Sequence, residues 1–251
     1  MTTTLNIPPL YELVMHDSID SAVSEAKRLA LSGAEEGTLV WVKEQTAGRG
    51  RFDHQWLSEP GNLHCAIVLR PDEPIAVTGQ INYVAAVSLA IAISGLVTPM
   101  TELRYRWPND VLLNDLKVAG ILLDPCAVNN GNVESIVLAI NVNVKSHPKD
   151  LDDRAANMHA DGFSTSTDAE LLESFSRNFL SWINRWAEDG FGPIGKAWTQ
   201  RANGMGEPIE LQLAKETVSG EFVELDADGA LVVKLADDTR RKVTVAEFFS
   251  I

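Results

Sequence analysis

The segment from residue 77 to residue 97 constrains the fold most strongly, because it has the length of a helix and is apolar almost all round. A surface helix has one apolar face, whereas a helix that is apolar on every side must be covered on every side. We therefore expect a helix that packs on a sheet and is covered on its other face. Ser88, Ser94 and Gly95 interrupt the segment, which argues against a transmembrane span.

Short runs with strand character lie on both sides of this segment. A helix is expected between the first two runs, over residues 20–31, where small apolar residues recur on one side. The runs with strand character are 10–14, 38–43, 62–69, 103–107, 111–113, 116–123 and 135–144. The first hundred residues therefore mix strands and helices, whereas residues 102–143 are expected to be strands joined by tight turns.

The remaining residues predict one long helix and then a small β domain. Thr167 and Glu170 have the spacing of a capping box, which predicts that a helix begins there. An apolar stripe at helical spacing follows, and we interpret it as core: Leu172, Phe175, Phe179, Trp182 and Trp186. Four short strands are then expected over 207–213, 218–225, 230–235 and 242–245, with a turn at 226–229. Their spacing indicates a small barrel or meander.

Composition excludes some classes of partner. With 35 acidic and 21 Lys and Arg residues the formal net charge is −14, so the average surface repels nucleic acid and anionic lipid. The residues before Tyr11 are too few for a helix-turn-helix and lack the pattern of a signal peptide. Cys65 and Cys126 lie in apolar stretches without metal-ligand spacing, which favours reduced thiols. We expect a cytoplasmic protein that binds neither nucleic acid nor membrane.

A loop with alternating glycines and arginines follows the strand at 38–43. It reads Gln45-Thr46-Ala47-Gly48-Arg49-Gly50-Arg51. Glycine permits a positive φ and a close approach of the backbone to a ligand, while the guanidinium fork of arginine matches carboxylate and phosphate oxygens. The loop is either an anion-binding element or a solvated surface loop.

Trp107-Pro108-Asn109-Asp110 places an amide and a carboxylate side by side at the end of a strand. These groups suit a nucleotide and Mg²⁺, although Asn and Asp are also ordinary turn residues. The next turn signal is Asn114-Asp115, which predicts a hairpin.

Lys117 lies inside an otherwise apolar strand. Period-two alternation predicts that it shares a face with Ala119 and Ile121. A lysine in this setting either extends from a sheet edge to solvent or points at a bound anion. Gly120 leaves the opposite face bare, as expected where a ligand comes close.

In this order, the segments resemble the biotin protein ligase family, part of the wider biotin and lipoate ligase group. The matching stretches are 45–51 with Trp56, then 61–63, 107–110, 117–123 and 140–143. The resemblance implies an α+β fold in which a mixed sheet is flanked by helices, as in class II synthetase-like catalytic domains. It also implies a small C-terminal SH3-like β-barrel and no N-terminal DNA-binding domain. The expected division is a catalytic domain at 1–202 and the β domain at 203–251.

The resemblance implies a two-step reaction with ATP, Mg²⁺ and biotin. The acid would attack the α-phosphate to form an acyl-adenylate, and a lysine of a biotin carboxyl carrier protein domain would then accept the acyl group. Lys117, Arg49 and Arg51 would be the catalytic residues. The expected binding residues are Ser18, Gln45, Gly48, Gly50, Trp56, Asn109, Asp110, Gly120 and Asn141, with Asp110 also as a magnesium ligand.

Three positions depart from the family pattern. Ile19 stands where a hydroxyl residue usually contacts the ureido group of biotin, and Asp53 and His54 alter the cationic loop. These changes keep two alternatives open: a ligase for lipoate or octanoate, and a catalytically impaired homologue that binds a ligand or carrier. The sheet edges could also support a homodimer.

Overall fold

The computed structural model describes residues 5–50, 55–148 and 154–249. Its main element is a sheet with the strand order β1-β2-β3-β8-β7-β6-β5, in which the short β4 also pairs with β8. The strands are β1 (Glu12–Ile19), β2 (Thr38–Gln45), β3 (Leu63–Leu69), β4 (Glu73–Pro74), β5 (Leu103–Arg106), β6 (Asp110–Leu113), β7 (Leu116–Asn129) and β8 (Asn132–Val142). β1 and β2 are parallel and the other neighbours are antiparallel, so the predicted mixed sheet is confirmed.

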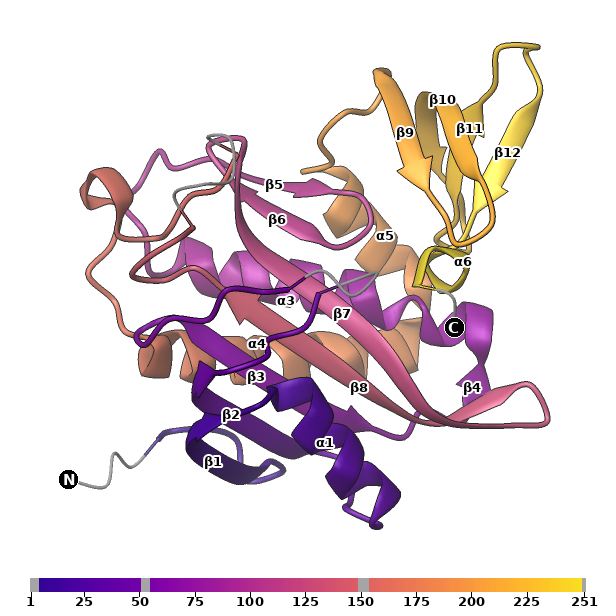
Figure 1. Cartoon of the computed structure of the whole chain (residues 1–251). Coiled ribbons are helices and arrows are strands. Elements are labelled where there is room, and N and C mark those ends of the chain that lie inside the picture. The colour runs from indigo at the N-terminus through magenta and orange to yellow at the C-terminus, as the bar shows by residue number, and fades with distance from the viewer. Residues whose placement is uncertain (1–4, 51–54, 149–153, 250–251) are drawn as a thin grey trace.

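Helices cover the two faces of this sheet unequally (Figure 1). The helices are α1 (Ala22–Leu31), α2 (Ile75–Thr78), α3 (Ile81–Ser94), α4 (Asp168–Asp189) and α5 (Phe191–Thr199). α3, α4 and α5 pack on one face and form the larger apolar core with it. α1 packs on the other face over β2, β3 and β8, with a smaller apolar cluster beneath it. On the face that carries α1, the part of the sheet that α1 does not cover has no other helix over it in Figure 1. The candidate site lies on this part of the sheet.

The apolar segment at the centre of the sequence is the core helix that its composition predicts. It is divided at Gly79 and Gln80 into α2 and α3. By length and composition Ile75–Ser94 could cross a membrane, but 72% of an 18-residue apolar stretch within it is buried inside the protein. The segment therefore packs between the sheet and α4.

The expected helix starts and strand lengths are partly corrected. Thr167 and Glu170 form the predicted capping box at the start of α4. α1 begins at Ala22 instead of residue 20, because the N-cap Ser21 has an extended backbone and Asp20 before it turns its side chain to pair with Arg28. β7 and β8 are longer than expected because they form a hairpin around Asn130 and Gly131, which both have positive φ.

The C-terminal residues form a separate antiparallel sheet, as predicted. Its order is β12-β11-β10-β9, and the elements are β9 (Pro208–Gln212), β10 (Thr217–Leu225), β11 (Leu231–Lys234) and β12 (Arg240–Val243). A helix that the sequence did not predict, α6 (Val245–Phe249), follows β12. Phe248 of this helix packs edge-on against Trp107, with 5.2 Å between ring centroids.

α3 fixes the turn that carries Asn109 and Asp110. The side-chain amide of Asn82 donates to the carbonyl of Pro108, and the indole N–H of Trp107 donates to the hydroxyl of Tyr83 at 2.7 Å. Tyr83 in turn donates to the carbonyl of Gly229, in the turn between β10 and β11 of the C-terminal sheet. The buried helix thus ties the turn to both sheets.

Asn62 fixes the end of β8 beside the candidate site. Its side-chain oxygen accepts hydrogen bonds from the backbone N–H groups of Val144, Lys145 and Ser146 at 2.9, 2.9 and 3.1 Å. Its amide nitrogen donates to the carbonyl of Ser146. The side chain is 2% exposed, so water cannot easily replace it.

We predict that Asn62→Ala lowers the free energy of unfolding by about 2 kcal/mol or more, because buried donors lose their acceptor. Urea denaturation would measure the change. Asn132→Ala is the control, since the Asn132 amide makes one hydrogen bond, to the carbonyl of Asp72, at the surface. Equal midpoints for the two variants would contradict this role of Asn62.

Candidate functional site

A cavity of about 650 Å³ opens on the sheet face that α1 leaves uncovered. This volume lies within the range of small-molecule sites. Residues from four of the predicted segments line it together: Arg49, Gly50, Trp56, Asn109, Asp110, Lys117, Gly120 and Asn141. Asn143 and Phe248 also line it, although the sequence interpretation did not assign them to the site. Ser18, Gln45 and Gly48 are not among the lining residues.

The Lys117 ammonium forms an ion pair with Asp110 inside the cavity. The Nζ and Oδ1 atoms are 2.7 Å apart, and the side chains are 31% and 12% exposed. The same ammonium lies 5.5 Å from the ring centroid of Trp56. Lys117 therefore points at the Asn-Asp turn and the aromatic wall instead of extending from a sheet edge.

The predicted face of Lys117 is wrong, because β7 has a bulge. Val111 pairs with Ala119 and Leu112 with Lys117, which leaves Val118 as the extra residue. Ala119 and Ile121 point into the large core, whereas a Cβ atom placed on Gly120 would lie 3.7 Å from Cε of Lys117. The bulge thus moves Lys117 from the core face to the cavity face.

Backbone pairing outside the sheet holds the bulge. The N–H of Lys117 donates to the carbonyl of Arg154, and its carbonyl accepts from the N–H of Ala156, both at 2.9 Å. Asn109 is held similarly, because its side-chain amide donates to the carbonyl of Ile121 at 3.1 Å. These bonds fix the lysine and the turn relative to each other.

Trp56 lies directly over Gly120. A Cβ on Gly120 would come within 2.9 Å of Cζ3 of the Trp56 ring, so this position has no room for a side chain. The indole nitrogen of Trp56 and the side-chain oxygen of Asn143 are buried without a hydrogen-bond partner among the described residues. A bound polar ligand could supply both partners.

The glycine-arginine loop closes on itself beside the cavity. The N–H of Trp56 donates to the carbonyl of Gly48 at 2.9 Å, and Arg49 forms a β-bridge with Gln55. A Cβ on Gly48 would lie 2.4 Å from the Trp56 carbonyl oxygen. Glycine is therefore needed at 48 for close packing of the loop on itself. Arg51, Asp53 and His54 lie outside the described residues.

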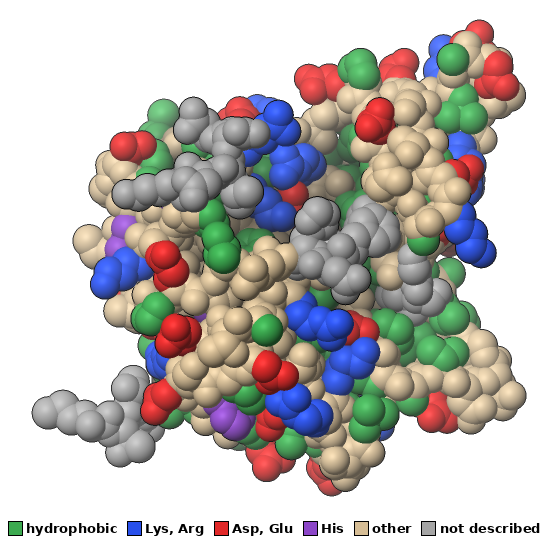
Figure 2. Space-filling model, in the orientation of Figure 1, with side chains coloured by type: hydrophobic (Ala, Val, Ile, Leu, Met, Phe, Trp, Pro, Cys, Tyr) green, Lys and Arg blue, Asp and Glu red, His purple; other side chains and the backbone are tan. Residues whose placement is uncertain are grey.

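Figure 2 shows Lys and Arg side chains gathered over β5 and β6 in this generally acidic protein. Arg106, Arg104 and Lys117 belong to these elements and their neighbour β7. Each of these side chains is paired with a carboxylate, Arg104 with Glu102 and Asp115, and Arg106 and Lys117 with Asp110, so an anionic ligand has to compete with those partners.

A buried polar network adjoins the cavity at Asn141. Its side-chain oxygen accepts from the amide of Gln45 at 3.1 Å and lies 2.9 Å from Nδ1 of His64. The Gln45 amide also donates to Ser58, and its oxygen accepts from the N–H of Ala22 at the start of α1. Gln45 is thus fully engaged with the protein and orients Asn141.

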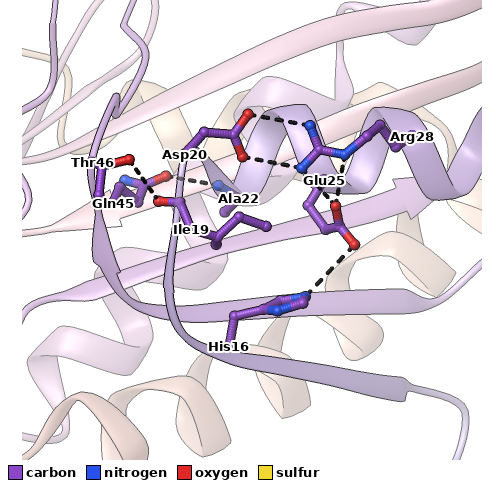
Figure 3. Close-up of polar contacts among 8 residues, drawn as sticks. All are labelled: His16, Ile19, Asp20, Ala22, Glu25, Arg28, Gln45 and Thr46. Carbon is purple, nitrogen blue, oxygen red and sulfur yellow. Dashed lines mark hydrogen bonds and ion pairs between the residues drawn. The ribbon is translucent and has the colours of Figure 1, made fainter.

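The loop between β1 and α1 is held by the pairs drawn in Figure 3. Arg28 binds both carboxylate oxygens of Asp20, at 3.0 and 3.2 Å, and this holds the pKa of Asp20 below its usual value. The carbonyl of Ile19 accepts from the N–H of Thr46 at 2.9 Å. Ser18 is exposed on β1, and the structure does not bring it into the cavity.

Two family models together match almost the whole chain. The model of the Biotin/lipoate A/B protein ligase family matches residues 7–200, and that of the Biotin protein ligase C terminal domain matches residues 204–250. The chain belongs to the biotin/lipoate protein ligase family.

Relatives within this ligase family align along most of the chain. A biotin–[acetyl-CoA-carboxylase] ligase of Paracoccus denitrificans is 33% identical, over 92% of this chain and 97% of its own length. A bifunctional ligase/repressor BirA of Bacillus subtilis is 31% identical, over 91% of this chain and 71% of its own length. The biotin protein ligase from Aquifex aeolicus, solved with biotin and ATP, has the same fold, with a TM-score of 0.78 at 23% identity, over 94% of this chain and 97% of that one.

The sequence interpretation missed Arg106 in this member of the ligase family. Arg106 and Asp110 are cross-strand partners on β5 and β6, on either side of the Trp-Pro-Asn turn. Their Nη2 and Oδ2 atoms are 2.6 Å apart. Opposite charges flanking a tight turn could have indicated this pair from the sequence.

We predict that His64 makes this ligase-family fold sensitive to acid. Burial lowers the pKa of His64 below its ordinary value, and the hydrogen bond to Asn141 opposes this only in part. Below an ordinary pKa of about 6.5 the unfolded chain takes up a proton that the folded chain refuses, so stability falls by up to about 1.4 kcal/mol per pH unit. His64→Gln should remove this component, measured as urea midpoints between pH 7 and pH 5. If His64→Gln keeps the wild-type dependence of stability on pH, His64 is not the source of the acid sensitivity. His147→Gln is the control, because it removes a histidine outside the buried network.

Proposed function

We propose that this chain is a cytoplasmic ATP-dependent biotin protein ligase. It would join biotin to ATP as biotinyl-adenylate and transfer the biotinyl group to a lysine of a biotin carboxyl carrier protein domain. The observation that carries the proposal is the Lys117 ammonium, which faces a cavity of about 650 Å³ together with Asn109, Asp110 and Trp56. The names and high coverage of the Paracoccus and Bacillus relatives support the choice of reaction.

Adenylation brings negative charge to the cavity. A carboxylate oxygen attacks the α-phosphorus, and pyrophosphate leaves. The Lys117 ammonium is the half-buried cation available to offset charge on the acid and the phosphate as the new bond forms. Arg49, exposed at the cavity mouth, adds a second cation beside the closed loop.

Transfer requires that the adenylate survive until the acceptor arrives. The acceptor amine attacks the acyl carbon and AMP leaves. Water would cleave the same mixed anhydride, so the wall formed by Trp56, Phe248 and the Gly48 loop protects it by excluding solvent. We propose Asn141 and Asn143 as polar contacts to the ligand, with Gln45 orienting Asn141.

The residues around the cavity do not fit a magnesium ion held by Asp110. Both oxygens of this carboxylate already contact cations, Lys117 at 2.7 Å and Arg106 at 2.6 Å. Across residues 5–50, 55–148 and 154–249, no group of three His, Cys, Asp or Glu side chains could hold a metal ion. We therefore do not propose Asp110 as a magnesium ligand, and Mg²⁺ that accompanies ATP would be held mainly by the phosphates of the nucleotide.

We predict that Lys117→Ala lowers biotin-dependent pyrophosphate release by roughly a hundred- to a thousandfold, the usual loss when one charge-stabilising group is removed. Pyrophosphate release and mass spectrometry of a biotin-accepting carrier domain would measure the two steps. Lys27→Ala is the matched control, because Lys27 also pairs with an aspartate, at 2.6 Å to Asp124, but does not line the cavity. If the wild-type protein neither releases pyrophosphate nor modifies the carrier, the proposal is rejected and the catalytically impaired alternative is favoured.

A second candidate, a ligase for lipoate or octanoate, is favoured by one observation. Ile19 and Leu122 both pack against the apolar cluster under α1, and Leu122 also lines the cavity, so this end of the sheet carries hydrocarbon where the family pattern has a hydroxyl. Each CH₂ of an alkyl acid that is buried against this hydrocarbon would gain about 0.8 kcal/mol.

We predict that biotin, and not lipoate or octanoate, raises the melting temperature most when each acid is added at equal concentration with ATP. The ligand that binds the folded state most tightly stabilises it most. Differential scanning fluorimetry would rank the three acids. A larger shift with octanoate or lipoate would assign the second candidate, and equal shifts would refute acid selectivity.

A further inference from the structure

Asp110 is shared between two cations. Its Oδ1 atom lies 2.7 Å from Nζ of Lys117, while Oδ2 lies 2.6 Å from Nη2 and 3.1 Å from Nε of Arg106. The carboxylate is 12% exposed, the arginine 46% and the lysine 31%. The three groups together carry one net positive charge at the cavity wall.

Because Asp110 is shared with Arg106, it holds the Lys117 ammonium less firmly. A carboxylate paired with one ammonium alone would neutralise it fully and hold it firmly, whereas a second cation on the other oxygen weakens the hold on the first. Arginine suits this task because two of its donors reach one oxygen in a fixed geometry. The strand register fixes the arrangement, since Arg106 is the cross-strand partner of Asp110.

We propose that Arg106 is a positioning residue that shares Asp110 with Lys117 and so keeps the Lys117 ammonium available to anionic substrates. This inference rests on the proposed function only for its effect on catalysis. The contacts themselves make Asp110 the anchor of two cations, which also accounts for the misfit with a magnesium ligand.

The test compares the chemical reactivity of Lys117 in the full chain. Wild type, Arg106→Gln, Arg106→Lys and Asp110→Asn would be treated with a limiting amount of acetic anhydride, and acetylation of each lysine measured by peptide mass spectrometry. In Arg106→Gln, Asp110 holds Lys117 alone, so acetylation of Lys117 should slow roughly two- to fivefold, the range that a partly exposed ion pair provides. In Asp110→Asn it should accelerate, and Arg106→Lys should restore the wild-type rate.

Arg104→Gln is the matched control. Arg104 lies two residues earlier on β5 and also pairs with acidic groups, Glu102 and Asp115, but it does not contact Asp110 in the described structure. In the Arg104→Gln variant, Lys117 should be acetylated by acetic anhydride at the wild-type rate. Faster acetylation in Arg106→Gln would reveal local loosening, and a rate equal to that of Arg104→Gln would show no coupling; either result overturns the proposal.

Kinetics then separate this inference from the proposed function. If the wild type releases pyrophosphate, Arg106→Gln should lower kcat while the KM for ATP stays within about twofold, because the residue acts through Lys117 and not on the nucleotide. A raised KM with unchanged kcat would overturn the positioning role in favour of direct ATP binding. If the wild type is inactive but the acetylation pattern holds, the proposed function fails and the shared carboxylate stands.

Discussion

The arrangement of the site depends on one ion pair, that of Lys117 and Asp110. An ammonium removed from water on the face of a sheet is costly unless an opposite charge lies beside it. Here the carboxylate comes from the first residue of β6 and the ammonium from the second residue of β7, so the hairpin that brings these strands together also brings the charges together. The bulge at Val118 turns the lysine toward the cavity.

The rest of the fold can be understood as support for that pair. α3 is buried along most of its length and holds the Trp-Pro turn through Asn82 and Tyr83, so the start of β6 cannot shift without disturbing the core. On the other face, α1 covers only part of the sheet and leaves the start of β7 and the end of β8 open to a ligand. The same sheet is therefore a rigid core wall on one face and a binding surface on the other.

Elements with strong local signals could be predicted from the sequence. The all-round apolar segment gave the core helix, the spacing of Thr167 and Glu170 gave the capping box, and Asn114-Asp115 gave a turn in which both residues have positive φ. These features depend on residues near one another in the chain. The motif residues that gather at the cavity could be predicted because the family pattern is specific.

Features that depend on distant partners could not be predicted. The face of Lys117 is set by pairing with residues 154–156, about forty positions away, and period-two alternation carries no information about that bulge. The hydrogen bonds of the Gln45 amide with Ala22, Ser58 and Asn141 also join residues far apart in the chain, so the sequence did not indicate them. Ser18 is exposed because its neighbour Ile19 packs into the apolar cluster instead.

Labelling with an acyl-phosphate derivative of ATP would test most directly whether the ammonium of residue 117 faces the phosphates of a nucleotide. Such a reagent transfers its acyl group to an amine beside the bound phosphates, and the modified lysine is found by peptide mass spectrometry. The account predicts that Lys117 is acylated ahead of the other lysines and that excess ATP prevents it. Acylation spread over surface lysines, with no protection of Lys117 by ATP, would contradict the account.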